Sequence, residues 1–448
     1  MVIKEGTGTP GHSAPVHTSP HSLDDLRAGR LAGLKRLDLS CGLKEFPREI
    51  FELADTLEVL NLSGNALQQL PDDLHRLTRL RVLFASDNLF TDLPESIGQC
   101  LALQIVGFKA NQISHVPAQA LPPRLRWLIL TDNRIQRLPE ALGDCQALQK
   151  LMLAGNQLQK LPSSLARCEQ LELVRIAANQ LTQLPSWLLE LPSLAWLAYA
   201  GNPLCTEPAQ PAVRQIPWQQ LHVQQQLGEG ASGVIQQAHW HSPHQAEKAV
   251  AIKLYKGSVT SDGSPLNEMA ACIAAGNHAN LIGIEGQILD HPQGQSGLVM
   301  QLIAPSFANL AGPPSLESCT RDIYPAAMRL SLSVVLRIAH GIASVTAHLH
   351  ACGMTHGDLY GHNILWQADG TCLLGDFGAA SFHPAAAYGH ALERIETRAF
   401  GILLGELLNR CEEDASQLTA LRQLQARCVQ PAVNERPALR DIEPLLRF

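Results

Sequence analysis

The sequence predicts a solenoid of α/β repeats followed by a mixed α+β domain. A leucine pattern recurs about every 23 residues from Leu34 to Asn202. After a Pro- and Gln-rich break, a glycine-rich run comes first, and a set of acidic and amide residues follows it near the end of the chain. With 448 residues, the chain is long enough for two domains that each have a sizeable core.

Composition narrows the class of protein. The net charge of −7 disfavours nucleic acid and anionic lipid as main partners, because both attract basic surfaces. The 11 cysteines are scattered without a CxxC pair, which indicates reduced thiols in a reducing compartment. No apolar run approaches the roughly 20 residues of a membrane span. Residues 1–21 carry no apolar core of a secretory signal and are predicted to be disordered, so we expect a cytoplasmic protein.

Residues 22–205 are predicted to form the solenoid. Ser22 is a good helix N-cap, so residues 22–30 predict a helix that caps the first repeat. The leucines at the first, fourth and sixth repeat positions point into a core that no single repeat could bury. Asparagines at the ninth position are expected to hydrogen-bond neighbouring turns as a ladder, at Asn65, Asn88, Asn111, Asn133, Asn156, Asn179 and Asn202. The first copy is one residue short and has Gly42 at that position.

A Leu-Pro pair at the bend of most repeats is predicted to turn the chain onto the convex side, because proline cannot continue a strand ladder. The pattern resembles the leucine-rich repeat over residues 34–205. The resemblance implies short strands lining a concave face that binds a protein. The side chains expected on that face form an apolar stripe of Val59, Val82, Phe84, Ile105, Trp127, Ile129, Met152, Leu173 and Trp196. Alternatively, some of them pack under flanking residues or on the second domain.

Residues 206–217 are aperiodic and are predicted to be a linker. A GxGxxG pattern follows, with Gly228, Gly230 and Gly233, and such a pattern can also open a dinucleotide-binding unit. Here a strand rather than a helix is expected after the glycines, and no acidic residue is placed to bind a ribose. Lys253 ends the strand AVAIK, from which it can reach the α- and β-phosphates under a glycine-rich hairpin.

The stretch THGDLYGHNILW contains Asp358 and Asn363, and Asp376 follows in LLGDFG. One group to orient an attacking hydroxyl and two to hold Mg²⁺ are what a phosphoryl-transfer site needs. A Gly-Asp pair in isolation is more often only a turn. The order in which these residues follow the glycines and Lys253 favours the phosphoryl-transfer interpretation.

Residues 218–448 resemble a protein kinase domain, an α+β fold with two lobes. The resemblance implies ATP and Mg²⁺ as cofactors. It implies Asp358 as the acid/base, Lys253 paired with Glu268 as the clamp on the phosphates, and Asn363 with Asp376 as metal ligands. The nucleotide would contact the glycine hairpin, an adenine pocket and a hinge with Met300 as gatekeeper, through Leu227, Gly228, Gly230, Ser232, Gly233, Ile235, Ala251, Lys253, Met300, Leu302 and Leu365.

The same resemblance places further residues. Cys272 would stack towards Phe377 and His356 in the internal apolar spine of the family. Glu396 stands where the family has a buried aspartate in its central helix, and Arg436 matches a late Arg-Pro pair.

The sequence departs from the family at three places. Gly357 replaces the arginine before the catalytic aspartate, which makes regulation by a phosphorylated activation segment doubtful. Tyr360 replaces the lysine that touches the γ-phosphate in serine/threonine kinases. The activation segment between Gly378 and Glu396 is very short and shows no Ala-Pro-Glu.

These observations predict an ATP-dependent protein kinase, serine/threonine-specific by family default, whose repeats bind a protein partner or regulate the kinase half. Two alternatives stay open. One is a catalytically weak pseudokinase scaffold that binds nucleotide and a partner. The other is a small-molecule phosphotransferase, because HGDL also resembles enzymes of the aminoglycoside type.

Overall fold

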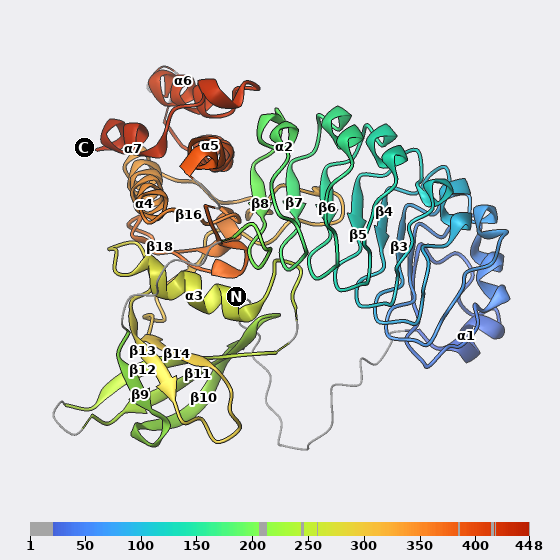
Figure 1. The fold of residues 1–448 in the computed structure, drawn as a ribbon, viewed down its shortest axis with the longest axis horizontal. Coiled ribbons are helices and arrows are strands. Elements are labelled where there is room, and N and C mark those ends of the chain that lie inside the picture. The colour runs from blue at the N-terminus through green and yellow to red at the C-terminus, as the bar shows by residue number, and fades with distance from the viewer. Residues whose placement is uncertain are drawn as a thin grey trace. The chain divides into compact units, whose positions relative to one another are not determined.

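The computed structural model describes residues 21–205, 213–242, 246–257, 259–383, 386–413, 416 and 418–447 (Figure 1). These residues form two units. The smaller unit holds the described residues up to Val174 together with Asn179–Ser193, and the larger unit holds Arg175–Ala178 together with the described residues from Leu194 onwards. The predicted disordered segment, apart from His21, and most of the predicted linker lie outside the described residues.

The repeats form a parallel sheet, which confirms the predicted solenoid. Its eight strands follow one another in sequence order. Each strand has three residues, and from β1 to β6 each residue pairs with its counterpart one repeat later. The strands are β1 Arg36–Asp38, β2 Val59–Asn61, β3 Val82–Phe84, β4 Ile105–Gly107, β5 Trp127–Ile129, β6 Lys150–Met152, β7 Leu173–Arg175 and β8 Trp196–Ala198.

The asparagine ladder is confirmed. The Nδ2 atom of Asn65 donates to the carbonyl oxygen of Leu39 at 2.8 Å and to that of Leu62 at 2.9 Å. Its Oδ1 atom accepts from the backbone N–H of Leu43 at 3.0 Å. Asn133 repeats this pattern one turn to the next. Backbone groups that the tight turns leave without ladder partners are therefore satisfied by side chains.

Short helical turns carry the chain along the convex side. In six of them proline is the N-cap residue, in keeping with its fixed φ and missing N–H. The turns are η1 Arg48–Leu53, η2 Leu74–Arg76, η3 Glu95–Gln99, η4 Ala118–Ala120, η5 Glu140–Asp144, η6 Ser163–Arg167 and α2 Ser186–Glu190. The predicted capping helix is α1, Leu23–Arg27, and the hydroxyl of Ser22 accepts from the backbone N–H of Asp25 at 3.0 Å.

The predicted apolar stripe is only partly exposed. Val82, Ile105, Leu173 and Trp196 are buried, so the prediction of an exposed side chain is wrong for these four. Part of the stripe packs on itself, because Phe84 lies over Gly107, where an added Cβ would come within 2.5 Å of its ring. The residues that keep intermediate exposure are Val59, Phe84, Trp127, Ile129 and Met152.

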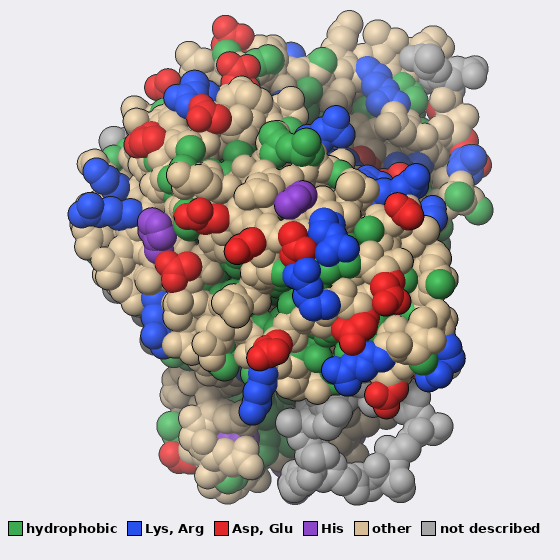
Figure 2. Space-filling model, turned by 90° about the vertical axis from the view of Figure 1, so that its right-hand side faces the viewer, with side chains coloured by type: hydrophobic (Ala, Val, Ile, Leu, Met, Phe, Trp, Pro, Cys, Tyr) green, Lys and Arg blue, Asp and Glu red, His purple; other side chains and the backbone are tan. Residues whose placement is uncertain are grey.

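The face in Figure 2 shows acidic and basic side chains interspersed, with hydrophobic groups between them. Ion pairs also join neighbouring repeats, such as Arg48–Asp73 at 2.6 Å and Arg81–Glu58 at 3.7 Å. The described residues of this face therefore give no broad basic surface of the kind that binds nucleic acid.

The larger unit begins with a six-stranded sheet in the order β10-β11-β12-β14-β13-β9. Its strands are β9 Gln215–Pro217, β10 Leu221–Glu229, β11 Gly233–Trp240, β12 Lys248–Tyr255, β13 Ile284–Leu289 and β14 Gly297–Gln301. Assignment of Gln215–Pro217 to the linker is wrong, because β9 pairs in parallel with β13. Ile216 is buried in the core of this sheet with Trp240 and Val250.

Helices and short strands make up the rest of the larger unit. The helices are α3 Pro265–Ala275, α4 Leu332–Ala351, α5 Ala386–Leu408, α6 Thr419–Cys428 and α7 Leu439–Ile442, with turns η7 Trp218–Gln220, η8 Gly361–Asn363, η9 Phe377–Ala379, η10 Val433–Glu435 and η11 Glu443–Leu446. The strands are β15 Ala308–Asn309, β16 Met354–Thr355, β17 Ile364–Trp366, β18 Cys372–Leu374 and β19 Ser381–Phe382.

Among the described helices, α4 alone has the length and apolar composition of a membrane span. Half of its apolar window is buried inside the fold. Val335, Ile338, Ile342 and Leu349 are fully buried at helical spacing, and the core helix of a folded domain has this same pattern.

Candidate active site

The glycine-rich hairpin joins β10 and β11. The backbone N–H of Gly230 donates to the carbonyl oxygen of Gly233 at 2.9 Å and closes the turn. A Cβ at position 233 would lie 2.5 Å from the carbonyl oxygen of Leu254, so only glycine fits there. The hairpin therefore keeps its backbone close to the neighbouring strand β12.

Lys253 and Glu268 form a buried ion pair between β12 and α3. The N-cap Ser264 and Pro265 in the first turn start α3 just before the glutamate. Glu268 is 2% exposed, so the pair is shielded from solvent. Burial acts to lower the pKa of Lys253, but the charge and hydrogen bond of Glu268, with smaller contributions from Cys272 and Asp376, together raise it. The lysine is therefore held in its charged form.

The loop that carries Asp358 is held from beneath by Glu396 of α5. The carboxylate of Glu396 accepts from the backbone N–H of His356 at 3.2 Å and from that of Gly357 at 2.7 Å. It also forms a hydrogen bond of 2.8 Å with Nε2 of His350. Glu396 is buried, as its match to a buried aspartate of the family implied, and it anchors this loop.

Asp358 and Asn363 are joined directly. The Nδ2 atom of Asn363 donates to Oδ2 of Asp358 at 2.8 Å and to its carbonyl oxygen at 2.9 Å. Asn363 closes η8, and β17 starts at the next residue. The NH₂ group of Asn363 therefore fixes the plane of the carboxylate.

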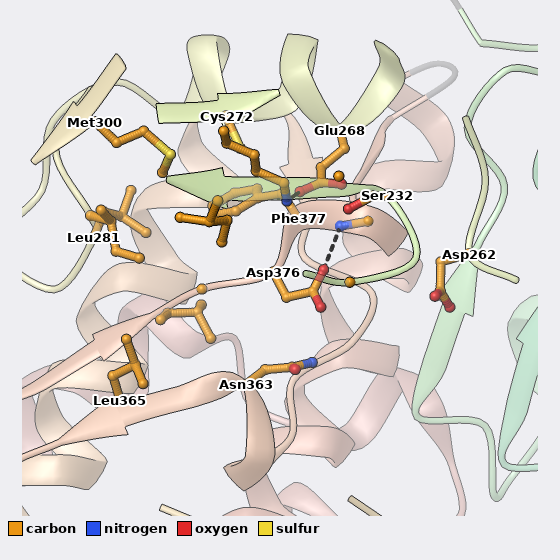
Figure 3. Close-up of a pocket in the computed structure, with 18 of the residues that line it drawn as sticks. Ser232, Asp262, Glu268, Cys272, Leu281, Met300, Asn363, Leu365, Asp376 and Phe377 are labelled. Atoms are coloured by element: carbon orange, nitrogen blue, oxygen red, sulfur yellow. Dashed lines mark hydrogen bonds and ion pairs between the residues drawn. The ribbon is translucent and has the colours of Figure 1, made fainter. Parts of the chain in front are cut away.

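Asp376 lies in the left-handed region, with φ of 55°. Its Oδ1 atom accepts from the backbone N–H of Gly378 at 3.2 Å, and Figure 3 shows this bond beside the labelled Asn363. The ring of Phe377 meets that of His356 edge-on, with centroids 5.2 Å apart. The expected contact between the DFG phenylalanine and the loop histidine is thus present.

A cavity of about 280 Å³ lies between the sheet and the catalytic loop. Its lining includes ten of the residues predicted for the site, namely Gly230, Ser232, Gly233, Ile235, Lys253, Glu268, Met300, Asn363, Leu365 and Asp376. Figure 3 shows the apolar Met300, Leu281 and Leu365 at one end and the polar groups at the other. An apolar compartment beside converging polar groups is typical of a nucleotide pocket.

Some predicted nucleotide contacts do not line this cavity. Leu227, Gly228 and Ala251 are outside its lining, and so is Asp358. The ladder between β10 and β11 shifts register around Gln226, which changes the side to which the following residues point. Leu302 follows the end of β14 and lines a separate cavity instead.

A profile of protein tyrosine and serine/threonine kinases matches residues 221–398, and a leucine-rich repeat profile matches residues 32–90. The first matched range contains Lys253, Glu268, Asp358, Asn363 and Asp376. The chain carries leucine-rich repeats followed by a protein kinase domain.

Two serine/threonine-protein kinases match this chain at low identity. A probable serine/threonine-protein kinase of Arabidopsis thaliana is 25% identical over 122 residues, which is 27% of this chain and 15% of the relative. The mouse proto-oncogene serine/threonine-protein kinase mos is 25% identical over 221 residues, which is 44% of this chain and 63% of the relative. This chain thus spans less than two thirds of either relative. A solved leucine-rich repeat protein of Leptospira interrogans is 30% identical with a TM-score of 0.39, covering 41% of this chain and 47% of that one.

The kinase domain also contains two residues that the sequence did not assign to the site. Arg175, at the end of β7, forms an ion pair with Asp358. Its Nη1 atom donates to the carbonyl oxygen of Gly357 at 3.0 Å, and its Nε atom to Asp262 at 2.7 Å. Trp196 of β8, predicted for the concave face, instead stacks on Tyr360 with ring centroids 4.1 Å apart.

The guanidinium of Arg175 lies between the carboxylates of Asp358 and Asp262, and the pKa values of these two groups shift in opposite directions. Burial acts to raise the pKa of Asp358, but the charges of Arg175, His362 and His356 and the hydrogen bond from Asn363 together lower it. Burial raises the pKa of Asp262, with the charges of Asp358 and Asp376 adding to it against Arg175. The arginine therefore helps to keep Asp358 ionised. Of the two carboxylates, Asp262 is the one that is protonated first as the pH falls.

Arg436 of the kinase domain is 1% exposed and donates to backbone carbonyls. Its Nε atom reaches the carbonyl oxygen of Gln430 at 2.7 Å, and Nη1 reaches that of Arg394 at 3.3 Å. Burial lowers its pKa to about 9. Nη1 also donates to the carbonyl oxygen of Leu194 at 3.5 Å, and these bonds to backbone oxygens compensate part of the cost of burying the charge.

Proposed function

We propose that the kinase domain transfers the γ-phosphate of ATP to a protein hydroxyl, of serine or threonine by preference. The observation that carries the proposal is the convergence of Lys253, Asn363 and Asp376, from three separate elements, on a single cavity. The volume of about 280 Å³ is near the lower end for small-molecule pockets. The serine/threonine preference rests on the names of the plant and mouse relatives.

The donor set fits Mg²⁺. Asp376 offers a carboxylate and Asn363 an amide oxygen, and hard oxygen ligands with few protein contacts are what Mg²⁺ takes in phosphate sites. When bound, Mg²⁺ neutralises charge on the β- and γ-phosphates. The bond from Asn363 to Asp358 leaves the amide oxygen for the metal, since only the NH₂ group is used in that contact.

Each residue of the site has a distinct task in the proposal. Lys253, kept charged by Glu268, holds the α- and β-phosphates. The hairpin backbone covers the phosphates with N–H groups. Asp358 orients the acceptor hydroxyl and takes its proton late, so its position matters more than its basicity. Catalysis is then positioning and electrostatics, with no covalent intermediate on the protein.

The test is phosphate transfer by the purified full-length protein with labelled ATP and Mg²⁺. We expect label on the chain itself or on an added protein, located on serine or threonine by mass spectrometry. Lys253→Met should abolish the signal, because the phosphates lose their clamp. Nucleotide binding without any transfer by the wild type would favour the pseudokinase scaffold.

One observation keeps the small-molecule alternative in view. Among the described residues between η9 and α5, β19 is the one regular element, and α5 starts at Ala386, ten residues before Glu396. This short segment leaves little chain to form the shelf on which kinases dock peptides. Generic proteins and small alcohols should therefore be compared as acceptors under the same conditions. Transfer to alcohols alone would contradict the protein-kinase assignment.

We also propose that the repeats bind a protein. Nε1 of Trp127 donates to Sδ of Met152 at 3.1 Å. Nζ of Lys150 lies 4.3 Å from the centroid of the Trp127 ring. With Phe84 and Ile129, these partly exposed side chains form an apolar surface of the kind that binds proteins. A cytoplasmic location stays a prediction of the sequence.

A further inference from the structure

We propose that Arg175, which belongs to the repeats in sequence, is a positioning residue for Asp358 and supplies the cation that the catalytic loop lacks. The inference rests on the proposed kinase function. Gly357 and Tyr360 stand where the family has basic residues beside the catalytic aspartate. In this chain a guanidinium reaches the same carboxylate from a position 183 residues earlier.

All three nitrogens of the Arg175 guanidinium have partners in the kinase domain. Nη2 contacts Oδ1 of Asp358, Nη1 donates to the carbonyl oxygen of Gly357, and Nε donates to Asp262. The side chain is 1% exposed. A buried arginine is costly unless paired and hydrogen-bonded, and this one faces two carboxylates and a carbonyl group. The contact therefore has the character of a built site rather than a surface ion pair.

The carboxylate of Asp358 is held from both sides. Arg175 contacts Oδ1, while Asn363 donates to Oδ2 at 2.8 Å. Each carboxylate oxygen keeps a second lone pair, so an acceptor hydroxyl can still bind. Fixing both oxygens sets the direction in which that hydroxyl is held, and a misplacement of about 1 Å can cost about 100-fold in rate.

The two unusual loop residues fit the same arrangement. Gly357 has φ of 74°, and a Cβ there would lie 2.6 Å from the carbonyl oxygen of Ala379 and 2.8 Å from that of Leu197. Tyr360 is 5% exposed because Trp196 stacks on it, with an interplanar angle of 9°. Both positions are therefore filled by contacts that exclude the basic side chains of the family.

The hydrogen bonds around Gly357 and Tyr360 are also buried. Nε1 of Trp196 donates to the carbonyl oxygen of Leu359 at 3.1 Å. The hydroxyl of Ser381, in the activation segment, accepts from the backbone N–H groups of Tyr199 at 3.0 Å and Ala200 at 3.1 Å. Trp196 is 1% exposed. Such burial is that of a core, which favours a permanent part of the site over a removable block.

Asp262 extends the link along the polar end of the cavity. It lies in the loop that precedes α3, and it lines the cavity together with Glu268. Figure 3 shows Asp262 to the right of Asp376 and Asn363, at the polar end of the pocket. Arg175 therefore connects the catalytic loop to the segment leading into the helix that holds Lys253 through Glu268.

The test compares full-length Arg175→Met, Arg175→Lys and Asp262→Asn with the wild type. Arg81→Met is the matched control, because Arg81 is an exposed arginine of an earlier repeat. We expect R175M to lower kcat about 100-fold, with KM for ATP within about twofold, because Arg175 does not line the cavity. R175K should recover part of kcat, since it restores the charge without the planar fork. D262N should lower kcat by less than R175M does, because Asp358 keeps its contact with Arg175.

A second readout does not depend on activity. Hydrogen exchange of residues 356–363 should quicken in R175M and stay at the wild-type rate in R81M. R175M leaves two carboxylates, Asp262 and Asp358, without their arginine. If R175M alone does not fold, the double variant R175M/D262N replaces it in the test, because one of these carboxylates is then removed. Unchanged exchange and unchanged kcat in R175M would overturn the inference. A higher kcat in R175M would also overturn it, because Arg175 would then block Asp358. If the wild type is inactive but R175M still shows the expected faster hydrogen exchange, the proposed function is contradicted and the positioning role of Arg175 is not.

Discussion

At the scale of single residues, the candidate site combines residues of known motifs with Arg175, which comes from outside those motifs. Lys253, Asn363 and Asp376 carry recognisable neighbours, and each lines the cavity. Arg175 has no such signal, because its repeat position holds Asp38, Asn61, Phe84, Gly107, Ile129, Met152 and Ala198 in the other copies. A basic residue at a position where no other copy has one was the available hint, and its partner lies too far along the chain for pattern reasoning.

Gly357 gives a prediction about the catalytic loop. Gly357→Ala should destabilise the fold by about 1–3 kcal/mol, because the residue has positive φ and the new Cβ would press on two backbone oxygens. Gly230→Ala is the control, since nothing lies within 4 Å of an added Cβ there. Denaturant unfolding of both variants measures the difference. Equal stability of G357A and wild type would contradict the crowded environment.

At the scale of elements, the repeat pattern predicted strands and ladder well because both depend on short, regular spacing. β9 was missed, since three residues of mixed character, Gln215–Pro217, carry no period of their own. Leu227 and Gly228 were misplaced by the register shifts in β10. Such irregularities arise from the whole sheet and leave no mark in a local stretch of sequence.

The ladder leads to a prediction about the repeats. Asn133→Ala should lower the free energy of unfolding by about 1–3 kcal/mol, because it leaves the carbonyls of Phe108 and Leu130 and the N–H of Ile113 without this partner. Gln136→Ala, at an exposed position of the same repeat, should change it by less than about 0.5 kcal/mol. Urea unfolding of the two variants decides. If the ladder has no structural role, both variants should show the same small change in the free energy of unfolding.

Helix α5 carries a carboxyl group with an unusual pKa. Burial and the charge of Asp322 raise the pKa of Glu406 from 4.5 to about 7, although the hydroxyl of Tyr324 donates to it at 2.9 Å and Arg321 and Arg410 oppose the shift. The folded state therefore binds this proton more tightly than the unfolded state. Its contribution to stability is full below pH 4.5 and is lost as the pH rises to about 7.

Glu406→Gln should remove that dependence. Relative to the wild type, the variant should gain stability as the pH rises from 4.5 to 7, by up to about 3 kcal/mol, and stay level above. The glutamine oxygen can still accept from Tyr324. Thermal unfolding across this range, with the exposed Glu435→Gln as control, measures the effect. A constant difference between E406Q and wild type at every pH would refute the raised pKa.

At the scale of the whole molecule, the order of repeats and kinase domain was readable from sequence, whereas the border between them was not. The sequence assigned residues 22–205 to the repeats, yet Arg175–Ala178 and Leu194 onwards group with the kinase fold. Removing residues 1–217 would uncover Tyr360 and leave Asp358 without its arginine. We expect residues 218–448 alone to be poorly folded or at least about 100-fold less active than the full chain. Full activity of that fragment would contradict this.

The central claim is that Asp358 orients an acceptor hydroxyl for phosphate transfer from ATP. The most direct test is the rate of transfer from labelled ATP by the full-length Asp358→Asn variant, with nucleotide binding measured in parallel. We expect a loss of at least about 100-fold in rate, with ATP affinity retained, because Asp358 is outside the cavity lining. Transfer by the variant at the wild-type rate would contradict the account.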